Sequence, residues 1–171
     1  MIAYRPATVA DGSALDAMAQ AIWLETFGHS ASAEDIALYF SEAFGPQGRL
    51  IASLSDTAHQ IRLATDGAAM AGFAQLSAVW LGDPAIAAGA AQLSQLYVAT
   101  PWHGTGVAQA LMRWTIETAR AGGAPALVLT VWEENHRARA FYDRHGFRHI
   151  GDYAFPTGNQ VGRDLIMQLM L

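Results

Sequence analysis

Cysteine and lysine are both absent from this chain of 171 residues. Without cysteine, the protein can form no disulfide, no thiolate nucleophile and no cysteine-ligated zinc site. Without lysine, it lacks the amine that Schiff-base chemistry and the phosphate loop G-x-x-x-x-G-K-[ST] require. Any nucleophile or phosphate site must therefore be built from other groups.

Long apolar runs and an excess of positive charge are also missing. No stretch of about 18 uninterrupted apolar residues occurs, and the N-terminal sequence lacks the features of a signal peptide, so we expect a cytoplasmic protein with no membrane partner. Ten arginines against fifteen acidic residues give a net charge of −5, which argues against a nucleic-acid partner and is compatible with a cationic substrate. His145 and His149 are separated by the helix-breaking Gly146, so they do not form the H-E-x-x-H pair and no metal is expected.

The first half of the chain shows helical and strand periodicities in alternation. With 52% hydrophobic residues and no repeat or long linker, residues 1–171 are expected to form a single domain. The patterns predict, in order, a strand at 2–6, a helix through Leu15 and Ile22, a helix capped by Ser32, a short helix at 49–55, and two antiparallel strands about a turn at Asp66 and Gly67.

The second half reads as a strand–helix–strand unit followed by a helix and two strands. The predicted elements are a strand at 92–99, a helix that ends at Gly122, an apolar strand at 126–132, a helix from Asn135 to Gly146, and strands at 147–155 and 163–171. A loop of small residues at 82–90 precedes this unit.

A glycine-rich turn opens the helix of that unit. Gly104, Gly106 and Ala108 leave its first turn almost bare of side chains, and the free N–H groups of a helix start attract anions, phosphate above all. The alternative is a tight strand-to-helix connection without a ligand. Gln109 stands where the third glycine of the dinucleotide fingerprint G-x-G-x-x-G belongs, so this is not that motif.

The order of motifs from residue 92 to residue 147 resembles the GCN5-related N-acetyltransferases, the GNAT superfamily. Their acetyl-CoA signature Q/R-x-x-G-x-G/A is matched by the segment HGTGVA at 103–108, with histidine in the Gln/Arg place. The resemblance implies an α/β fold with a mixed, mostly antiparallel sheet of about seven strands, flanked by helices and splayed between the fourth and fifth strands. It also implies acetyl-CoA as cosubstrate.

A closer resemblance, to bacterial spermidine/spermine N-acetyltransferases of the PaiA type, extends beyond that block. It is carried by ETFGH at 25–29, VWEENHRARAFYDRHGF at 131–147, and DLIM at 164–167. Gly162 departs from it, because a glutamine usually stands there. The resemblance implies acetyl transfer to a polyamine or similar small cation, and dimers are common among the relatives.

For the cofactor, the resemblance implies a specific set of residues. The pantetheine arm would pair with the strand edge at Leu96, Tyr97 and Val98, where an N–H near Val98 would polarise the thioester carbonyl. Tyr142 would protonate the departing thiolate, or else pack in the core as an ordinary aromatic residue. The remaining cofactor-binding residues implied are His103, Gly104, Thr105, Gly106, Val107, Ala108 and Asn135. Arg137 is a further candidate for the cofactor's phosphates, and both Arg137 and Arg139 would face either the phosphates or water.

The acceptor amine must lose a proton before it attacks. An alkylamine with a pKa near 10.4 is charged at pH 7, and its deprotonation costs roughly 4–5 kcal/mol. Glu133 is the first candidate for the base, or equally a solvated acid near a helix start. Glu25 and His29 are further candidates, because the resemblance implies that their helix end borders the acceptor groove, or else they are structural residues of a helix terminus. Trp80 and Trp102, in loops, would line the acceptor site.

Direct attack of the amine within a ternary complex is expected, because no cysteine is present to form an acyl-enzyme. A protein N-terminus or an amino-sugar antibiotic is the alternative acceptor. The alternative from another class is a non-catalytic sensor that binds acyl-CoA.

Overall fold

The computed structural model describes residues 1–171 as a mixed α/β structure. Its elements, in order, are β1 (Ile2–Pro6), η1 (Val9–Asp11), α1 (Gly12–Phe27), α2 (Ala33–Ala43), α3 (Arg49–Ser53), β2 (Gln60–Asp66), β3 (Ala69–Ala78), β4 (Ala91–Val98), η2 (Thr100–Trp102), α4 (Val107–Ala121), β5 (Ala126–Trp132), α5 (His136–Arg144), β6 (Arg148–Thr157) and β7 (Gln160–Met170). None of the helices has both the length and the apolar character needed to cross a membrane.

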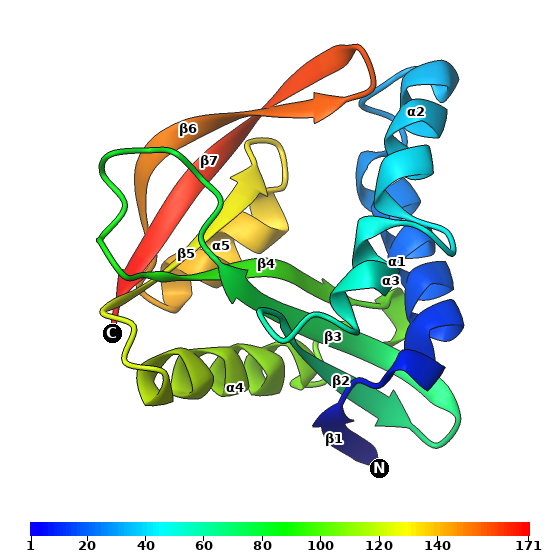
Figure 1. The fold of residues 1–171 in the computed structure, drawn as a ribbon, viewed down its shortest axis with the longest axis horizontal. Helices are drawn as coiled ribbons and strands as arrows, with labels where there is room; N and C mark the ends of the chain where they lie inside the picture. The colour runs from blue at the N-terminus through cyan, green and yellow to red at the C-terminus, as the bar shows by residue number, and fades with distance from the viewer.

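The strands form one seven-stranded sheet in the order β1-β2-β3-β4-β5-β7-β6 (Figure 1). Every neighbouring pair is antiparallel except β4 and β5, which are parallel and joined by the crossover helix α4. The predicted fold class, a mixed and mostly antiparallel sheet flanked by helices, is therefore confirmed.

The sheet is nearly divided between β4 and β5. These strands pair only at Ala91–Leu127 and Gln92–Val128, and then part. The register with β3 jumps by one residue at Ser94, because Gln75 lies opposite Gln95 while Leu76 lies opposite Leu93. Such a bulge adds local twist to a strand, which helps to turn the rest of β4 away from β5.

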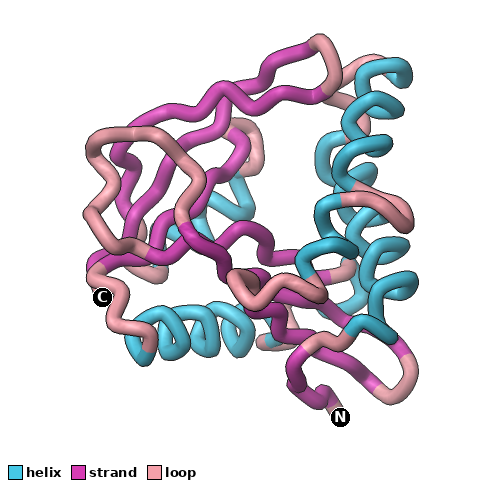
Figure 2. The backbone as a smooth tube through the Cα atoms, viewed as in Figure 1, coloured by secondary structure: helices cyan, strands magenta, loops and turns pink.

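Helices cover both faces of the sheet, as Figures 1 and 2 show. Alternation along β3 sends Phe73 into a cluster with Leu15 and Trp23 of α1, whereas Ala74 packs in a second cluster with Leu111 of α4. The two clusters fix α1 and α4 against opposite faces of the same strands. The free part of β4 lies between them.

The predicted and observed boundaries differ mainly in the last two strands and in the short helical turns. The sequence predicts a strand that ends at Phe155, but β6 continues through Pro156 to Thr157, and β7 begins at Gln160 rather than at Arg163. Because β6 lies at the edge of the sheet, a missing proline N–H is tolerated there. The short helical turns η1 and η2 were not predicted.

Candidate functional site

The turn before α4 exposes an unusual density of free backbone N–H groups. Gly104 (φ +75°) and Gly106 (φ +93°) adopt left-handed conformations, and a Cβ at either would meet open space. The first intrahelical bond at this end runs from the Ala110 N–H to the Gly106 carbonyl. The N–H groups of five residues donate to no other group of the chain: Gly104, Gly106, Val107, Ala108 and Gln109. They form a cradle for an anion.

His103 ties this turn to β4 and to α5. Its Nε2 lies 2.8 Å from the Val98 carbonyl oxygen, and its Nδ1 lies 2.6 Å from Nη1 of Arg137. Because a carbonyl can only accept and a guanidinium can only donate, Nε2 carries the ring proton and Nδ1 accepts. The neutral ring thus holds the Arg137 guanidinium beside the glycine turn. Arg139 instead donates to the Glu133 carbonyl over 2.7 Å.

Along the free edge of β4, only every second residue points its backbone N–H and carbonyl away from β3. The Ala99 N–H donates to Ala71 of the β3 segment, so the backbone groups of Tyr97 also point to β3, and those of Leu96 and Val98 point toward the opening. The Val98 carbonyl already accepts from His103. The groups left for an incoming strand-like ligand are the Leu96 N–H and carbonyl and the Val98 N–H.

Tyr142 lies on the far side of the opening, on α5. The Asn135 side chain caps this helix as predicted, accepting from the Ala138 N–H at 3.1 Å. Tyr142 is only 8% exposed, its ring packs against Phe141 and Phe147, and burial raises the pKa of its phenol. The hydroxyl therefore remains protonated at neutral pH, as a proton donor must.

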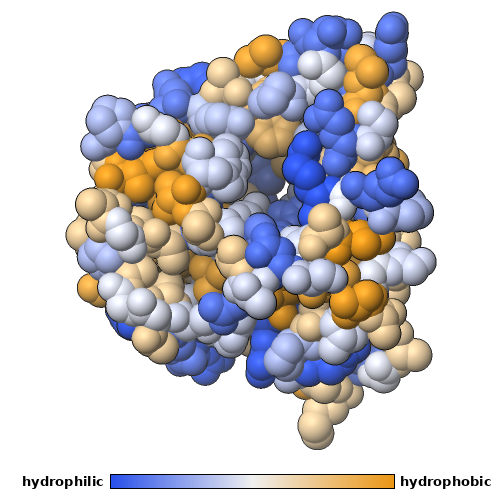
Figure 3. Space-filling view, viewed as in Figure 1, coloured by the Kyte–Doolittle hydropathy of each residue, from blue (hydrophilic) through white to orange (hydrophobic).

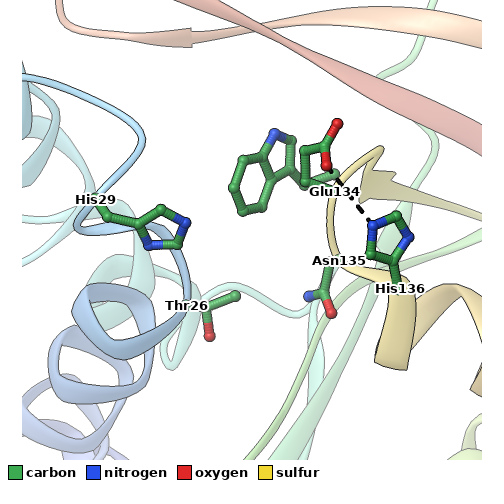
Figure 4. Close-up of a pocket in the computed structure, with 6 residues that line it drawn as sticks. Thr26, His29, Glu134, Asn135 and His136 are labelled. Carbon is green, nitrogen blue, oxygen red and sulfur yellow. Dashed lines mark ion pairs between the residues drawn. The ribbon is translucent and has the colours of Figure 1, made fainter.

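A hollow lies between the end of α1 and the loop after β5. It has a volume of about 470 Å³, and in Figure 4 Thr26 and His29 face the loop residues across it. The residues that line this hollow are Thr26, His29, Trp132, Glu134, Asn135 and His136. Figure 3 shows the molecular surface hollowed near the centre of the view.

The acceptor residues predicted from sequence have different partners in the structure. The Glu25 carboxylate accepts from the Thr100 hydroxyl at 2.9 Å, which ties α1 to the segment after β4. The His29 ring lies 5.6 Å from Trp132, and the exposed Trp80 ring lies 5.3 Å from Tyr153. Trp102 packs against the cluster that includes Leu111 of α4.

Glu133 does not present a free carboxylate. Its Oε2 accepts from Nη1 of Arg163 at 2.8 Å, and the same guanidinium contacts Asp152 at 2.9 Å. The Glu133 N–H also donates to the Arg163 carbonyl, which continues the strand pairing by one residue. Arg163 therefore holds the carboxylate predicted as the base.

Asp164 is the carboxylate that sequence reasoning missed. It is 8% exposed on β7, directly opposite Trp132 of β5 and Tyr153 of β6. Burial raises its pKa to about 6, the Thr130 hydroxyl opposes that shift, and the negative charge of Glu133 adds to it. A single acid within the apolar segment DLIM was the available signal.

The sequence of the chain matches a family model over residues 15–147, that of the acetyltransferase (GNAT) family. The chain belongs to this family. No curated protein matches it in a sequence search. The family membership agrees with the anion cradle before α4 and with the parting of β4 and β5.

Solved structures of GNAT proteins share the fold. The PaiA N-acetyltransferase from Thermoplasma acidophilum in complex with coenzyme A has a TM-score of 0.78 and 20% identity, over 100% of this chain and 99% of its own. The ribosomal-protein-S18-alanine N-acetyltransferase from Escherichia coli has a TM-score of 0.66 and 20% identity, over 99% and 94%. The yncA protein from Salmonella typhimurium, solved with its cofactor acetyl-CoA, has a TM-score of 0.73 and 18% identity, over 100% and 94%.

Asp164→Asn should stabilise the protein near pH 7.5 and have little effect near pH 4. The folded state raises the pKa of Asp164 from its usual 3.8 to about 6, so it binds the proton more tightly than the unfolded state does. The free energy of unfolding of the wild type therefore falls as pH rises from below 3.8 to above 6. The total loss is up to about 3 kcal/mol, at about 1.4 kcal/mol per pKa unit. Urea unfolding of both proteins across this pH range measures the effect.

Asp152→Asn is the matched control, because Arg163 lowers the pKa of this exposed carboxyl. The ionised Asp152 carboxylate stabilises the folded state above the usual aspartate pKa, and this contribution is lost as pH falls. Asp152→Asn should therefore destabilise the protein near pH 7.5, where Asp164→Asn should stabilise it. A stability difference between Asp164→Asn and the wild type that does not change with pH would contradict this account.

Proposed function

We propose that this GNAT protein transfers the acetyl group of acetyl-CoA to a primary amine, most favourably a polyamine or a similar small cation. One observation carries the proposal: the five free amides at the start of α4 and in the turn before it are tied by His103 to the unpaired edge of β4. The cradle can bind an anion, and the edge of β4 can pair with an extended chain. A single ligand with a diphosphate and an extended amide arm would occupy both. Acetyl-CoA has that form.

The cofactor-binding residues are proposed as follows. The backbone from Gly104 to Ala108 holds the diphosphate, each N–H to a charged oxygen contributing on the order of 1.5–3 kcal/mol. Arg137, held by His103, adds a positive charge next to that turn. Leu96 and Val98 pair with the pantetheine arm through their outward backbone groups. Thr105 and Asn135 border the same ligand.

The chemistry proposed is direct attack of the neutral amine on the thioester carbonyl. A preorganised N–H at the free edge of β4, that of Val98, stabilises the oxyanion as the tetrahedral intermediate forms. The carbon–nitrogen bond forms, the carbon–sulfur bond breaks, and Tyr142 donates its proton to the departing thiolate. The buried phenol then regains a proton from the newly acylated nitrogen, directly or through water.

A small cationic acceptor is favoured over a folded protein by the shape and charge of the groove. The hairpin of β6 and β7 arches across to α2, where the Asn159 N–H donates to Asp35 at 2.7 Å (Figure 1). Tyr39 and Phe155 add an aromatic contact with 5.7 Å between their rings. This bridge narrows access to the groove, and the net charge of −5 attracts a cation.

Thiol release from acetyl-CoA, measured over a panel of amines, tests the activity. Polyamines should give the largest kcat/KM, followed by simple alkylamines, with aminoglycosides and N-terminal peptides far below. If every amine fails while calorimetry still detects acetyl-CoA binding, the protein is an acyl-CoA sensor and the proposed activity is wrong.

Gly106→Ala should weaken acetyl-CoA binding by about tenfold or more, because the added methyl strains a left-handed residue and intrudes on the cradle. Gly67→Ala is the matched control, since Gly67 also has a positive φ (+60°) and open space but lies in the remote β2–β3 turn. Calorimetry with acetyl-CoA should separate the two variants while thermal unfolding shows similar losses. Equal affinities would remove the cradle from the cofactor site.

Tyr142→Phe should lower kcat by about 100-fold with acetyl-CoA affinity nearly unchanged, because the variant retains the ring and loses only the proton donor. Stopped-flow thiol release and calorimetry on the same preparation measure both quantities. A variant that turns over at the wild-type rate would leave Tyr142 as a packing residue only.

A further inference from the structure

We propose that Asp164 binds the ammonium group of the acceptor and removes its proton before attack. This inference deepens the proposed acetyltransferase function and depends on it. It assigns to a residue of β7 the role for which Glu133 was the first candidate.

The register of three strands places Asp164 next to Trp132, one of the residues that line the hollow between α1 and the loop after β5. Trp132 on β5 and Tyr153 on β6 are both directly opposite it, and side chains at opposite positions share one face of a sheet. The two predicted acceptor residues His29 and Trp80 contact these same rings, His29 on Trp132 and Trp80 on Tyr153. The carboxylate therefore lies between the residues expected to hold the amine.

Aromatic residues on the strands at either side of a carboxylate suit an alkylammonium ion. Cations are attracted to the faces of tryptophan and tyrosine rings, most strongly where water is excluded. At 8% exposure, Asp164 is nearly shielded from solvent, yet none of its oxygen atoms is both fully buried and unpartnered. The carboxylate oxygens therefore keep some contact with solvent, from which a cation would approach.

The charges around Asp164 leave it without a cationic partner in the chain. The groups that face it are Glu133 at the end of β5, Thr130 within β5, Tyr153 on β6, Tyr39 on α2 and Tyr97 on β4. No ion pair forms at Asp164, whereas Arg163 binds both Glu133 and Asp152. Asp164 is the carboxylate that a cationic substrate can neutralise.

The pKa of the Asp164 carboxyl also suits a general base that works near neutral pH. Burial raises the pKa of Asp164 to about 6, so the group is ionised at pH 7 and yet more basic than an ordinary aspartate. A general base works best when its pKa lies close to the working pH.

The proposed step balances as follows. The ammonium R–NH₃⁺ gives one proton to the Asp164 carboxylate, which leaves a neutral amine and a neutral acid. The amine attacks the thioester, the nitrogen loses its second proton, and the thiolate gains one by way of Tyr142. Asp164 then returns its proton to solvent, so each turnover releases one proton overall.

The pH dependence of kcat/KM for Asp164→Asn tests the proposal. In the wild type, the rate should rise with an apparent pKa of about 6 and stay level up to the pKa of the amine. In the variant, we expect a loss of about 100-fold at pH 7.5, and a rate that climbs with the neutral fraction of the amine in solution. Asp152→Asn, which makes the same chemical change on the neighbouring strand, should follow the wild-type profile.

A weakly basic amine separates proton removal from a structural role. Trifluoroethylamine, whose three fluorines withdraw charge from the nitrogen, is already neutral at pH 7.5, so Asp164→Asn should acetylate it at nearly the wild-type rate. Equal losses for both amines, or a wild-type profile in the variant, would overturn the proposal. Loss of the rising limb in Glu133→Gln and not in Asp164→Asn would assign the base to Glu133. A wild type that acetylates no amine would refute the proposed activity itself.

A titration without turnover keeps the proposal testable if the variant folds poorly. Carbon NMR of aspartate carboxyls in the wild type should show Asp164 titrating near 6, and tetramethylammonium should lower that midpoint. A midpoint that tetramethylammonium does not move would show that no cation binds at this carboxylate.

Discussion

The parting of β4 and β5 after two residue pairs is the constraint on which the rest of the site depends. A continuous parallel pair would satisfy every backbone group along β4 and leave no edge for an extended ligand. The same parting opens the other face of the sheet, where β5 and β7 turn toward α1 and α2. We therefore propose that the cofactor and the acceptor bind on two sides of one opening, and that the reacting groups meet where the strands diverge.

Two carboxylates near this opening have opposite surroundings, although they are separated by little distance in the fold. Glu133 is held by Arg163, which compensates its charge. Asp164 is buried without such a partner, and its pKa rises to about 6. Such a difference in surroundings gives two carboxylates different roles. Asp164, which has no cationic partner, is better suited to accept a proton, and Glu133, which is paired with Arg163, is better suited to keep its loop in place.

Local features of the site could be predicted from sequence, and features that depend on register could not. The glycine turn and the Asn135 cap follow from backbone conformation and the needs of a helix start, and both occur where they were expected. The link from Val98 through His103 to Arg137 joins residues far apart in the chain. The surroundings of Asp164 depend on how β5, β7 and β6 are aligned, which periodicity alone does not specify.

The register also explains why a fold would keep an uncompensated carboxylate in its interior. Arg163 is adjacent to Asp164 in sequence, but alternation along β7 directs the two side chains to opposite faces of the sheet. Arg163 lies opposite Ala154 and binds acids outside the groove, whereas Asp164 lies between Trp132 and Tyr153. A shift of one residue would exchange these positions and fill the groove with the protein's own cation. The alignment that withholds Arg163 from Asp164 is thus the one that leaves a negative charge for a cation from outside.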